Sequence, residues 1–177
     1  MANPSPLART AAAFFLATLC ALPHAAFAND YTDVNRLVGA KQYDQALARA
    51  DQYLAAKPRD PQMRFLRGVV LAESGKRAQA IEAYTQLTQE YPELPEPYNN
   101  LAVLYAQQNE YGKARDALEG AVRANPNYAT AHENLGDVYA KLAGESYAKA
   151  QQIDPANATA PPKLALVRQM LSTAAKR

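Results

Sequence analysis

The sequence predicts an all-α protein built as a stack of antiparallel helix pairs. Three series of residues keep an interval of 34 positions, and they are Ala46, Ala80 and Ala114; Pro58, Pro92 and Pro126; and Gly68, Ala102 and Gly136. An interval shared by several residue types indicates a structural repeat, and a period of about 34 residues is typical of stacked helix–turn–helix units. Within Tyr98–Tyr105 the apolar residues recur at steps of three and four, as the buried face of an amphipathic helix requires.

The composition of the 177-residue chain supports a folded protein with a packed core. Apolar residues make up 49% and charged residues 20%, which is not the composition of a disordered chain. The chain contains 19 Lys and Arg residues against 17 Asp and Glu residues, a net charge of +2. With no long basic run, this balance argues against nucleic acid as the main partner.

The N-terminal segment 1–28 differs from the repeats and has the features of a secretory signal. Arg9 precedes Thr10–Leu22, a 13-residue stretch dominated by apolar side chains, and Pro23 ends it. Residues 26–28, Ala-Phe-Ala, offer the small side chains that signal peptidase accepts, so we expect cleavage after Ala28 and a periplasmic location. An uncleaved anchor is the alternative, but a helix needs about 20 apolar residues to cross a bilayer.

Cys20 lies within the apolar stretch, so a lipoprotein signal has to be considered as well. That signal needs a small residue before the cysteine, whereas Leu19 stands there, and a lipid-anchored outer-membrane form is not expected. Cleavage would remove Cys20 and His24 and leave His132 as the one histidine. We therefore expect no disulfide, no thiol nucleophile, no metal site and no cofactor.

After the signal, the chain divides into four repeat units and an end segment. The predicted boundaries are 29–58 for a first unit that is degenerate in its first half, 59–92, 93–126, 127–155 for a contracted fourth unit, and 156–177 for a linker and a capping helix. In the third unit, Ala114 is small because two helices cross closely there, and a larger side chain would overpack the crossing. Gly68 and Gly136 are expected to serve the same close approach. Gly75 suits a turn between helices.

The fourth unit departs from the repeat because its terminal proline, Pro155, comes five positions early. The missing residues are those of the turn between its two helices. Residues 132–155 therefore form either one long helix, which we favour, or a pair with a tight bend at Ala143 and Gly144.

The last segment is read as a linker, Asn157–Pro162, followed by an amphipathic helix, Lys163–Ala174. Leu164, Val167 and Leu171 lie on one face of that helix. We expect this face to cap the exposed apolar end of the stack. A docking helix for another protein is the alternative.

The third unit carries the residues that identify a family. Read in order, they are Tyr98, Leu101-Ala102, Tyr105, Ala114, Leu118 and Pro126. This pattern resembles the tetratricopeptide repeat, and the resemblance extends from about Asp30 to Pro155. It implies a right-handed superhelical stack whose concave inner face holds an extended peptide or a helix of a partner.

The resemblance also implies which residues face that groove, through the first helix of each unit. Carried over position by position, they are Tyr31, Asn35, Phe65, Val69, Glu73, Asn99, Val103, Gln107, Glu133, Asp137 and Lys141. Phe65, Val69 and Val103 would form an apolar patch, although Phe65 and Val69 could instead be core residues. Since Lys141 is the one cation in the set, a partner with an apolar residue and nearby basic or amide groups suits the groove better than an acidic tail.

The sequence thus predicts a non-catalytic periplasmic scaffold or adaptor that binds another envelope protein. The alternative is a small-molecule-binding or enzymatic accessory protein that uses the same groove. His132 stands where the repeat has an aromatic residue and is expected to be a packing residue, and Asn100 and Asn134, which keep the repeat interval, are read as repeat positions and not as site residues. No stable membrane insertion is expected after cleavage. Self-association through the last helix is compatible with the scaffold prediction.

Overall fold

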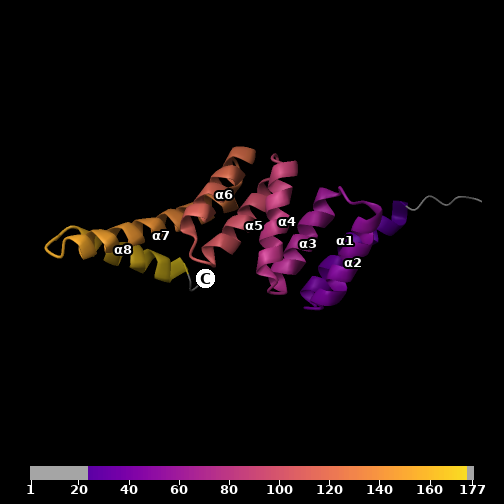
Figure 1. The fold of residues 1–177 in the computed structure, drawn as a ribbon, viewed down its shortest axis with the longest axis horizontal. Coiled ribbons are helices and arrows are strands. Elements are labelled where there is room, and N and C mark those ends of the chain that lie inside the picture. The colour runs from indigo at the N-terminus through magenta and orange to yellow at the C-terminus, as the bar shows by residue number, and fades with distance from the viewer. Residues whose placement is uncertain (1–23, 175–177) are drawn as a thin grey trace, which may run out of the picture.

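The structure, a computed structural model, describes residues 24–174, with side chains for residues 30–172. Eight helices and no strand make up this part of the chain (Figure 1), and their bounds are α1 His24–Gly39, α2 Tyr43–Ala56, α3 Pro61–Glu73, α4 Arg77–Glu90, α5 Pro95–Ala106, α6 Tyr111–Ala124, α7 Ala129–Ile153 and α8 Ala160–Ala174. The predicted all-α stack of helix pairs is confirmed. The predicted signal segment lies outside the described residues, apart from residues 24–28, whose backbone belongs to α1.

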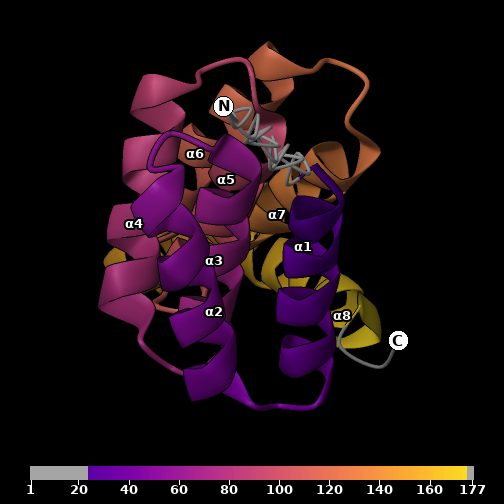
Figure 2. The ribbon, with the colours of Figure 1, turned by 90° about the vertical axis from the view of Figure 1, so that its right-hand side faces the viewer.

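The helices pack in chain order, so that each pair rests on the next. The stack runs from α1 and α2 at one end to α7 and α8 at the other (Figure 1). Figure 2 looks along the stack from the α1–α2 end and shows α2 and α4 to one side of α1. The first helices of neighbouring units also contact each other, since α1 contacts α3 and α5 contacts α7. These first helices form the inner wall of the stack.

A continuous apolar core holds the pairs together. One cluster joins α1, α2 and α3 around Val34, Ala46 and Met63. A larger cluster extends from Leu71 to Val138 across α3–α7. Leu47 packs against both clusters, so the core has no gap between the first and second pairs.

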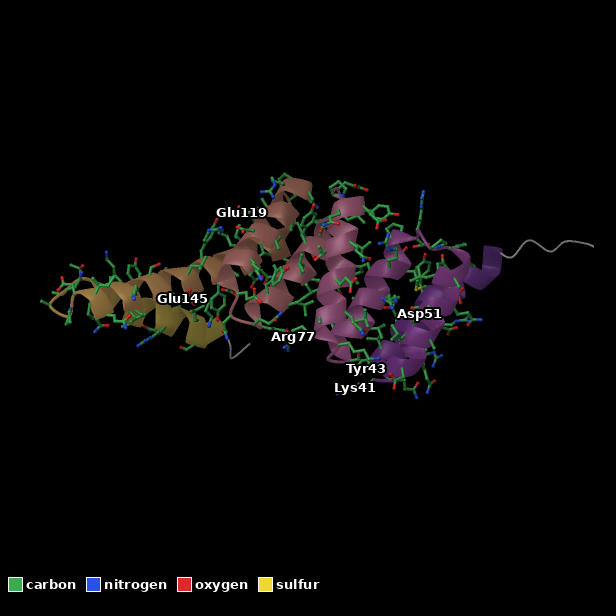
Figure 3. All side chains as sticks on the ribbon, in the orientation of Figure 1. Lys41, Tyr43, Asp51, Arg77, Glu119 and Glu145 are labelled. Carbon is green, nitrogen blue, oxygen red and sulfur yellow. The ribbon has the colours of Figure 1, made fainter. Side chains whose placement is uncertain are left out.

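The turns inside the first three pairs share one backbone geometry. Gly75 has a φ of 77°, which confirms its predicted turn, and Lys41 and Asn109 take φ values of 57° and 59° at the corresponding positions of the neighbouring units. This left-handed conformation is strained for residues other than glycine and is better tolerated by asparagine. Figure 3 shows Lys41 and Arg77 at the edge of the stack where these turns lie. The fourth position of the series is Ala143, which is helical within α7.

Two glycines lie under tyrosine rings, and one predicted contact is absent. A Cβ on Gly68 would lie 2.6 Å from Cε1 of Tyr84, which confirms its predicted close approach. The sequence did not single out Gly120, but a Cβ on this residue would lie 2.6 Å from Cδ1 of Tyr98. Nothing lies within 4 Å of a Cβ on Gly136, so the close approach predicted there is wrong.

The contracted fourth unit is one long helix, as favoured from the sequence. Helix α7 has 25 residues, and α8 folds back along its second half. Leu164 is buried and Val167 half-buried, and Cγ1 of Val167 would lie 3.4 Å from a Cβ on Gly144. Helix α8 begins at Ala160, earlier than predicted, because Oδ1 of Asn157 accepts hydrogen bonds from the N–H groups of Thr159 (3.0 Å) and Ala160 (2.9 Å).

Candidate functional site

The inner wall of the stack contains two adjoining clefts. The α5–α7 cleft encloses about 330 Å³ and is lined by Ala102, Val103, Ala106, Gln107, Tyr111, Leu118, Asn134, Asp137, Val138 and Lys141. The α3–α5 cleft encloses about 350 Å³ and is lined by Val69, Ala72, Glu73, Tyr84, Asn100, Val103, Leu104 and Gln107. Val103 and Gln107 line both. Because they stand one helical turn apart on α5, they form the ridge between the two clefts.

The α5–α7 cleft has an apolar floor and a charged rim. Leu118 and Val138 are buried at its base, whereas Val103 is 39% exposed, high for a valine in a helix. Asp137 and Lys141 are exposed on α7, one helical turn apart. The Lys141 Nζ lies 6.0 Å from the centroid of the Tyr111 ring, within the range of a cation–π contact. The cleft can therefore receive an apolar side chain between polar groups.

The α3–α5 cleft is polar, and its one charged lining residue is Glu73. The Tyr84 ring is buried in the core, and its hydroxyl accepts a hydrogen bond from Nδ2 of Asn100 at 3.2 Å. Burial raises the pKa of Tyr84 to about 12, the field of Glu73 raises it as well, and the Asn100 hydrogen bond opposes both. Tyr84 is therefore neutral at physiological pH and keeps a proton to donate.

A chain of amide side chains connects the two clefts beneath the ridge. Nδ2 of Asn134 donates to Oδ1 of Asn99 at 2.8 Å, and Nδ2 of Asn99 donates to Oδ1 of Asn100 at 3.4 Å. The chain ends at the Tyr84 hydroxyl and so links α7, α5 and α4. Asn100 and Asn134, set aside in the sequence as repeat positions, thus both line clefts. The repeat interval could have located them, since it places each on the first helix of its unit.

Six of the eleven predicted groove residues line these clefts, namely Val69, Glu73, Val103, Gln107, Asp137 and Lys141. Asn99 is 6% exposed and acts inside the amide chain. Phe65 is half-buried, with its ring centroid 5.7 Å from that of Tyr84. Asn35 and Glu133 are exposed on α1 and α7 and line neither cleft.

Tyr31, the eleventh residue, belongs to a hydrogen-bonded cluster at the first joint of the stack. Its hydroxyl donates to Oδ2 of Asp60 at 2.6 Å, and the hydroxyl of Tyr53 donates to the same oxygen at 2.8 Å. Burial and the hydrogen bond to Asp60 both raise the pKa of Tyr31. This cluster joins α1 and α2 to the start of α3, and Tyr31 is committed to it.

His132 does not lie in the core, so its predicted packing role is wrong. The ring is exposed at the start of α7, with Nε2 2.8 Å from the carbonyl oxygen of Pro126. Among residues 24–174, no three His, Cys, Asp or Glu residues gather closely enough to hold a metal ion. None of the helices in that range is both long enough and apolar enough to cross a bilayer.

Solved structures similar to this chain share its helical stack. The tetratricopeptide domain of Sgt2 from Aspergillus fumigatus is 20% identical, with a TM-score of 0.62 over 67% of this chain and 80% of that one. YrrB, described as a tetratricopeptide protein with an unusual peptide-binding site, is 25% identical, with a TM-score of 0.54 over 59% and 54%. The second such domain of human RPAP3, solved with an HSP70 peptide, is 14% identical, with a TM-score of 0.58 over 67% and 98%.

Two family models, both described as tetratricopeptide repeat, match residues 31–95 and 71–142. Together they span 31–142, which is 112 of the 177 residues and contains α2–α6 in full. The matched region also contains every lining residue of the two clefts. The helix pairs, the shared turn geometry and these matches agree, and the chain belongs to the tetratricopeptide-repeat family.

Proposed function

We propose that this protein is a non-catalytic periplasmic scaffold that binds a peptide or helix of another envelope protein in its inner groove. The observation that carries the proposal is Val103, an exposed apolar side chain on the ridge between two clefts. Exposed apolar groups that lie in a concave surface with polar groups around them are typical of binding sites.

Two of the similar structures support a polypeptide as the ligand. YrrB is described as having a peptide-binding site, and the RPAP3 domain was solved with a bound peptide. The charged groups that line the groove are divided between two clefts, with Glu73 in one and Asp137 and Lys141 in the other. This arrangement suits an elongated ligand better than the small molecule considered as the alternative.

The periplasmic location rests on the N-terminal sequence, Arg9, the apolar stretch and the Ala-Phe-Ala pattern at 26–28. Self-association is a further part of the proposal. Helix α8 contributes two large apolar side chains to the surface, Leu166 at 66% and Met170 at 49% exposed.

The groove is tested by Val103→Lys in a crosslinking pull-down from the cell envelope. A lysine at position 103 places a charged and longer side chain where the partner's apolar group would sit. The contact then no longer buries apolar surface, so the affinity for the partner falls. We expect the amount of each captured partner to fall about tenfold or more, as measured by quantitative mass spectrometry.

Ile153→Lys is the matched control, because it makes the same kind of change on an exposed apolar residue at the end of α7, away from the groove. Circular dichroism would verify that both variants are folded. Equal recovery of every partner by the Val103→Lys protein would exclude this groove as the binding site.

A further inference from the structure

The two clefts differ in chemistry, and the difference constrains the ligand. The floor of the α5–α7 cleft is apolar, with Leu118 and Val138 at its base. The α3–α5 cleft presents a carboxylate, Glu73, and neutral polar groups from Tyr84, Asn100 and Gln107. A ligand that fills both therefore needs an apolar group beside a group that a carboxylate attracts.

Glu73 has no basic partner among the described side chains, unlike two carboxylates of neighbouring helices. Outside the groove, Glu90 pairs with Arg64 (Oε2 to Nη1, 2.6 Å) and Asp51, labelled in Figure 3, pairs with Arg67 (Oδ1 to Nε, 2.6 Å). Glu73 takes part in none of the ion pairs found among the described side chains. It is exposed on the inner wall, where a ligand can reach it.

The other acidic group of the groove points to the same charge preference. Asp137 likewise takes part in none of the ion pairs formed by the described side chains, and it lines the α5–α7 cleft. Lys141 supplies the one basic side chain of the two clefts, and it lies over the ring of Tyr111. Two carboxylates against one ammonium group give the paired clefts a net charge of −1 at neutral pH, which favours a cationic ligand.

The spacing of the two groups follows from the helix between the clefts. The two clefts lie on either side of α5, and a helix with its side chains is about 10–12 Å across, so the clefts are separated by about that distance. An extended chain advances about 3.3 Å per residue, which makes the separation about three residues.

Building on the proposed function, we infer that the groove selects an extended segment with a large apolar side chain and, about three residues away, a lysine or arginine. The apolar side chain fills the α5–α7 cleft against Val103, Leu118 and Val138. The cationic side chain reaches Glu73 in the α3–α5 cleft, where the amide oxygens of Gln107 and Asn100 can accept further hydrogen bonds from it.

The inference is tested with fluorescein-labelled peptides of Gly and Ser that carry one leucine and one lysine, in either order and at spacings from two to five residues. Companion peptides replace the lysine with glutamine or glutamate. Fluorescence anisotropy measures their affinity for the wild type, Glu73→Gln, Glu73→Lys and, as a matched control, Glu82→Gln on the exposed side of α4.

We expect the lysine peptide at its best spacing to bind the wild type about two- to fivefold more tightly than the glutamine peptide, as an exposed ion pair allows. Glu73→Gln should remove that difference, Glu73→Lys should reverse it in favour of the glutamate peptide, and Glu82→Gln should leave it unchanged. High salt should reduce it.

The results separate this inference from the proposed function. Equal binding of the three peptide types by the wild type, with binding lost in Val103→Lys, would overturn the charge preference and leave the groove in place. Preferential binding of the glutamate peptides, or no binding of any leucine–lysine peptide, would also overturn the inference. Binding that survives Val103→Lys unchanged would contradict the groove itself.

Discussion

At the scale of single residues, the packing of the stack depends on pairs of one small and one large side chain. The Tyr84 ring on α4 lies over Gly68 on α3, and Leu118 and Ala102 stand at the corresponding positions of the next unit. Counted back from Pro155, the residue that corresponds to Tyr84 in the fourth unit is Tyr147, which lies in the second half of α7. Since that unit has no second helix crossing back at this point, no ring covers Gly136.

Alanine at the two glycines should therefore have opposite effects. A methyl group on Gly68 would meet Tyr84 at 2.6 Å, and the repacking should lower the free energy of unfolding by about 1–3 kcal/mol. Gly136→Ala, its matched control, adds a methyl group in open space inside a helix and should raise the free energy of unfolding by about 0.5–1 kcal/mol. Urea unfolding followed by circular dichroism measures both. A stabilised Gly68→Ala protein would contradict the crossing described here.

At the scale of elements, Asp60 fixes the first joint of the stack. Its Oδ1 accepts the backbone N–H of Met63 at 3.0 Å and so caps α3, and its Oδ2 accepts the hydroxyls of Tyr31 on α1 and Tyr53 on α2. Burial acts to raise the pKa of Asp60, but the hydrogen bonds, that of Tyr31 foremost, outweigh it and lower the pKa below its ordinary value of 3.8. Three helices thus share one carboxylate.

The pH dependence of the free energy of unfolding should show the contribution of the Asp60 carboxylate. Because folding lowers the pKa of Asp60, the unfolded chain takes up a proton first as the pH falls below about 4, and the stabilisation is lost as the pH passes through the folded value. At neutral pH, Asp60→Asn should lower the free energy of unfolding by about 1 kcal/mol, since charge-assisted hydrogen bonds become neutral ones. The wild type and the variant should converge in acid.

Urea titrations between neutral and acidic pH measure that difference. Asp44→Asn is the control, because Asp44 is almost fully exposed and its Oδ1 lies 3.6 Å from the Lys76 ammonium. An Asp60→Asn difference that stays constant with pH would show that the carboxylate charge does not hold the joint.

The long helix α7 shows how one element changes the end of the stack. The first three pairs turn at Lys41, Gly75 and Asn109, all with positive φ, but the corresponding Ala143 continues the helix. Alanine favours the helix and disfavours the left-handed turn, so α7 extends and α8 packs along its second half. The early Pro155 indicated the missing turn, and the structure shows the long helix in place of the tight bend.

At the scale of the whole molecule, the predicted cleavage site after Ala28 falls within α1, which begins at His24. Asp30 is buried on this helix, with its Oδ1 2.5 Å from Nη2 of Arg49, and Val34 lies in the core. Cleavage after Ala28 would remove residues 24–28 of α1 and retain Asp30 and Val34. The predicted mature chain therefore retains the contacts of α1 with α2 and α3 that these side chains make.

Expression of the full chain in a Gram-negative bacterium tests that boundary. We expect the intact mass of the protein recovered from the periplasm to correspond to Asn29–Arg177, because Ala26 and Ala28 place small side chains before that bond. Ala28→Tyr, which keeps the rest of the segment, should block cleavage at this position. A periplasmic protein of full-length mass would contradict the predicted cleavage.

The repeat interval by itself determined the all-α stack and its helix pairs, because each unit has the same apolar face to bury against its neighbours. The resemblance to the tetratricopeptide repeat, carried over position by position, placed Val69, Glu73, Val103 and Gln107 on the inner wall formed by the first helices, where they line the clefts. Only the tertiary structure decided that Tyr31 is bound to Asp60, that Asn99 is buried and that Asn100 and Asn134 line the clefts. The physical reason is that periodicity fixes the face of a helix on which a residue lies, whereas the neighbouring helices decide whether its side chain is paired, covered or open to a ligand.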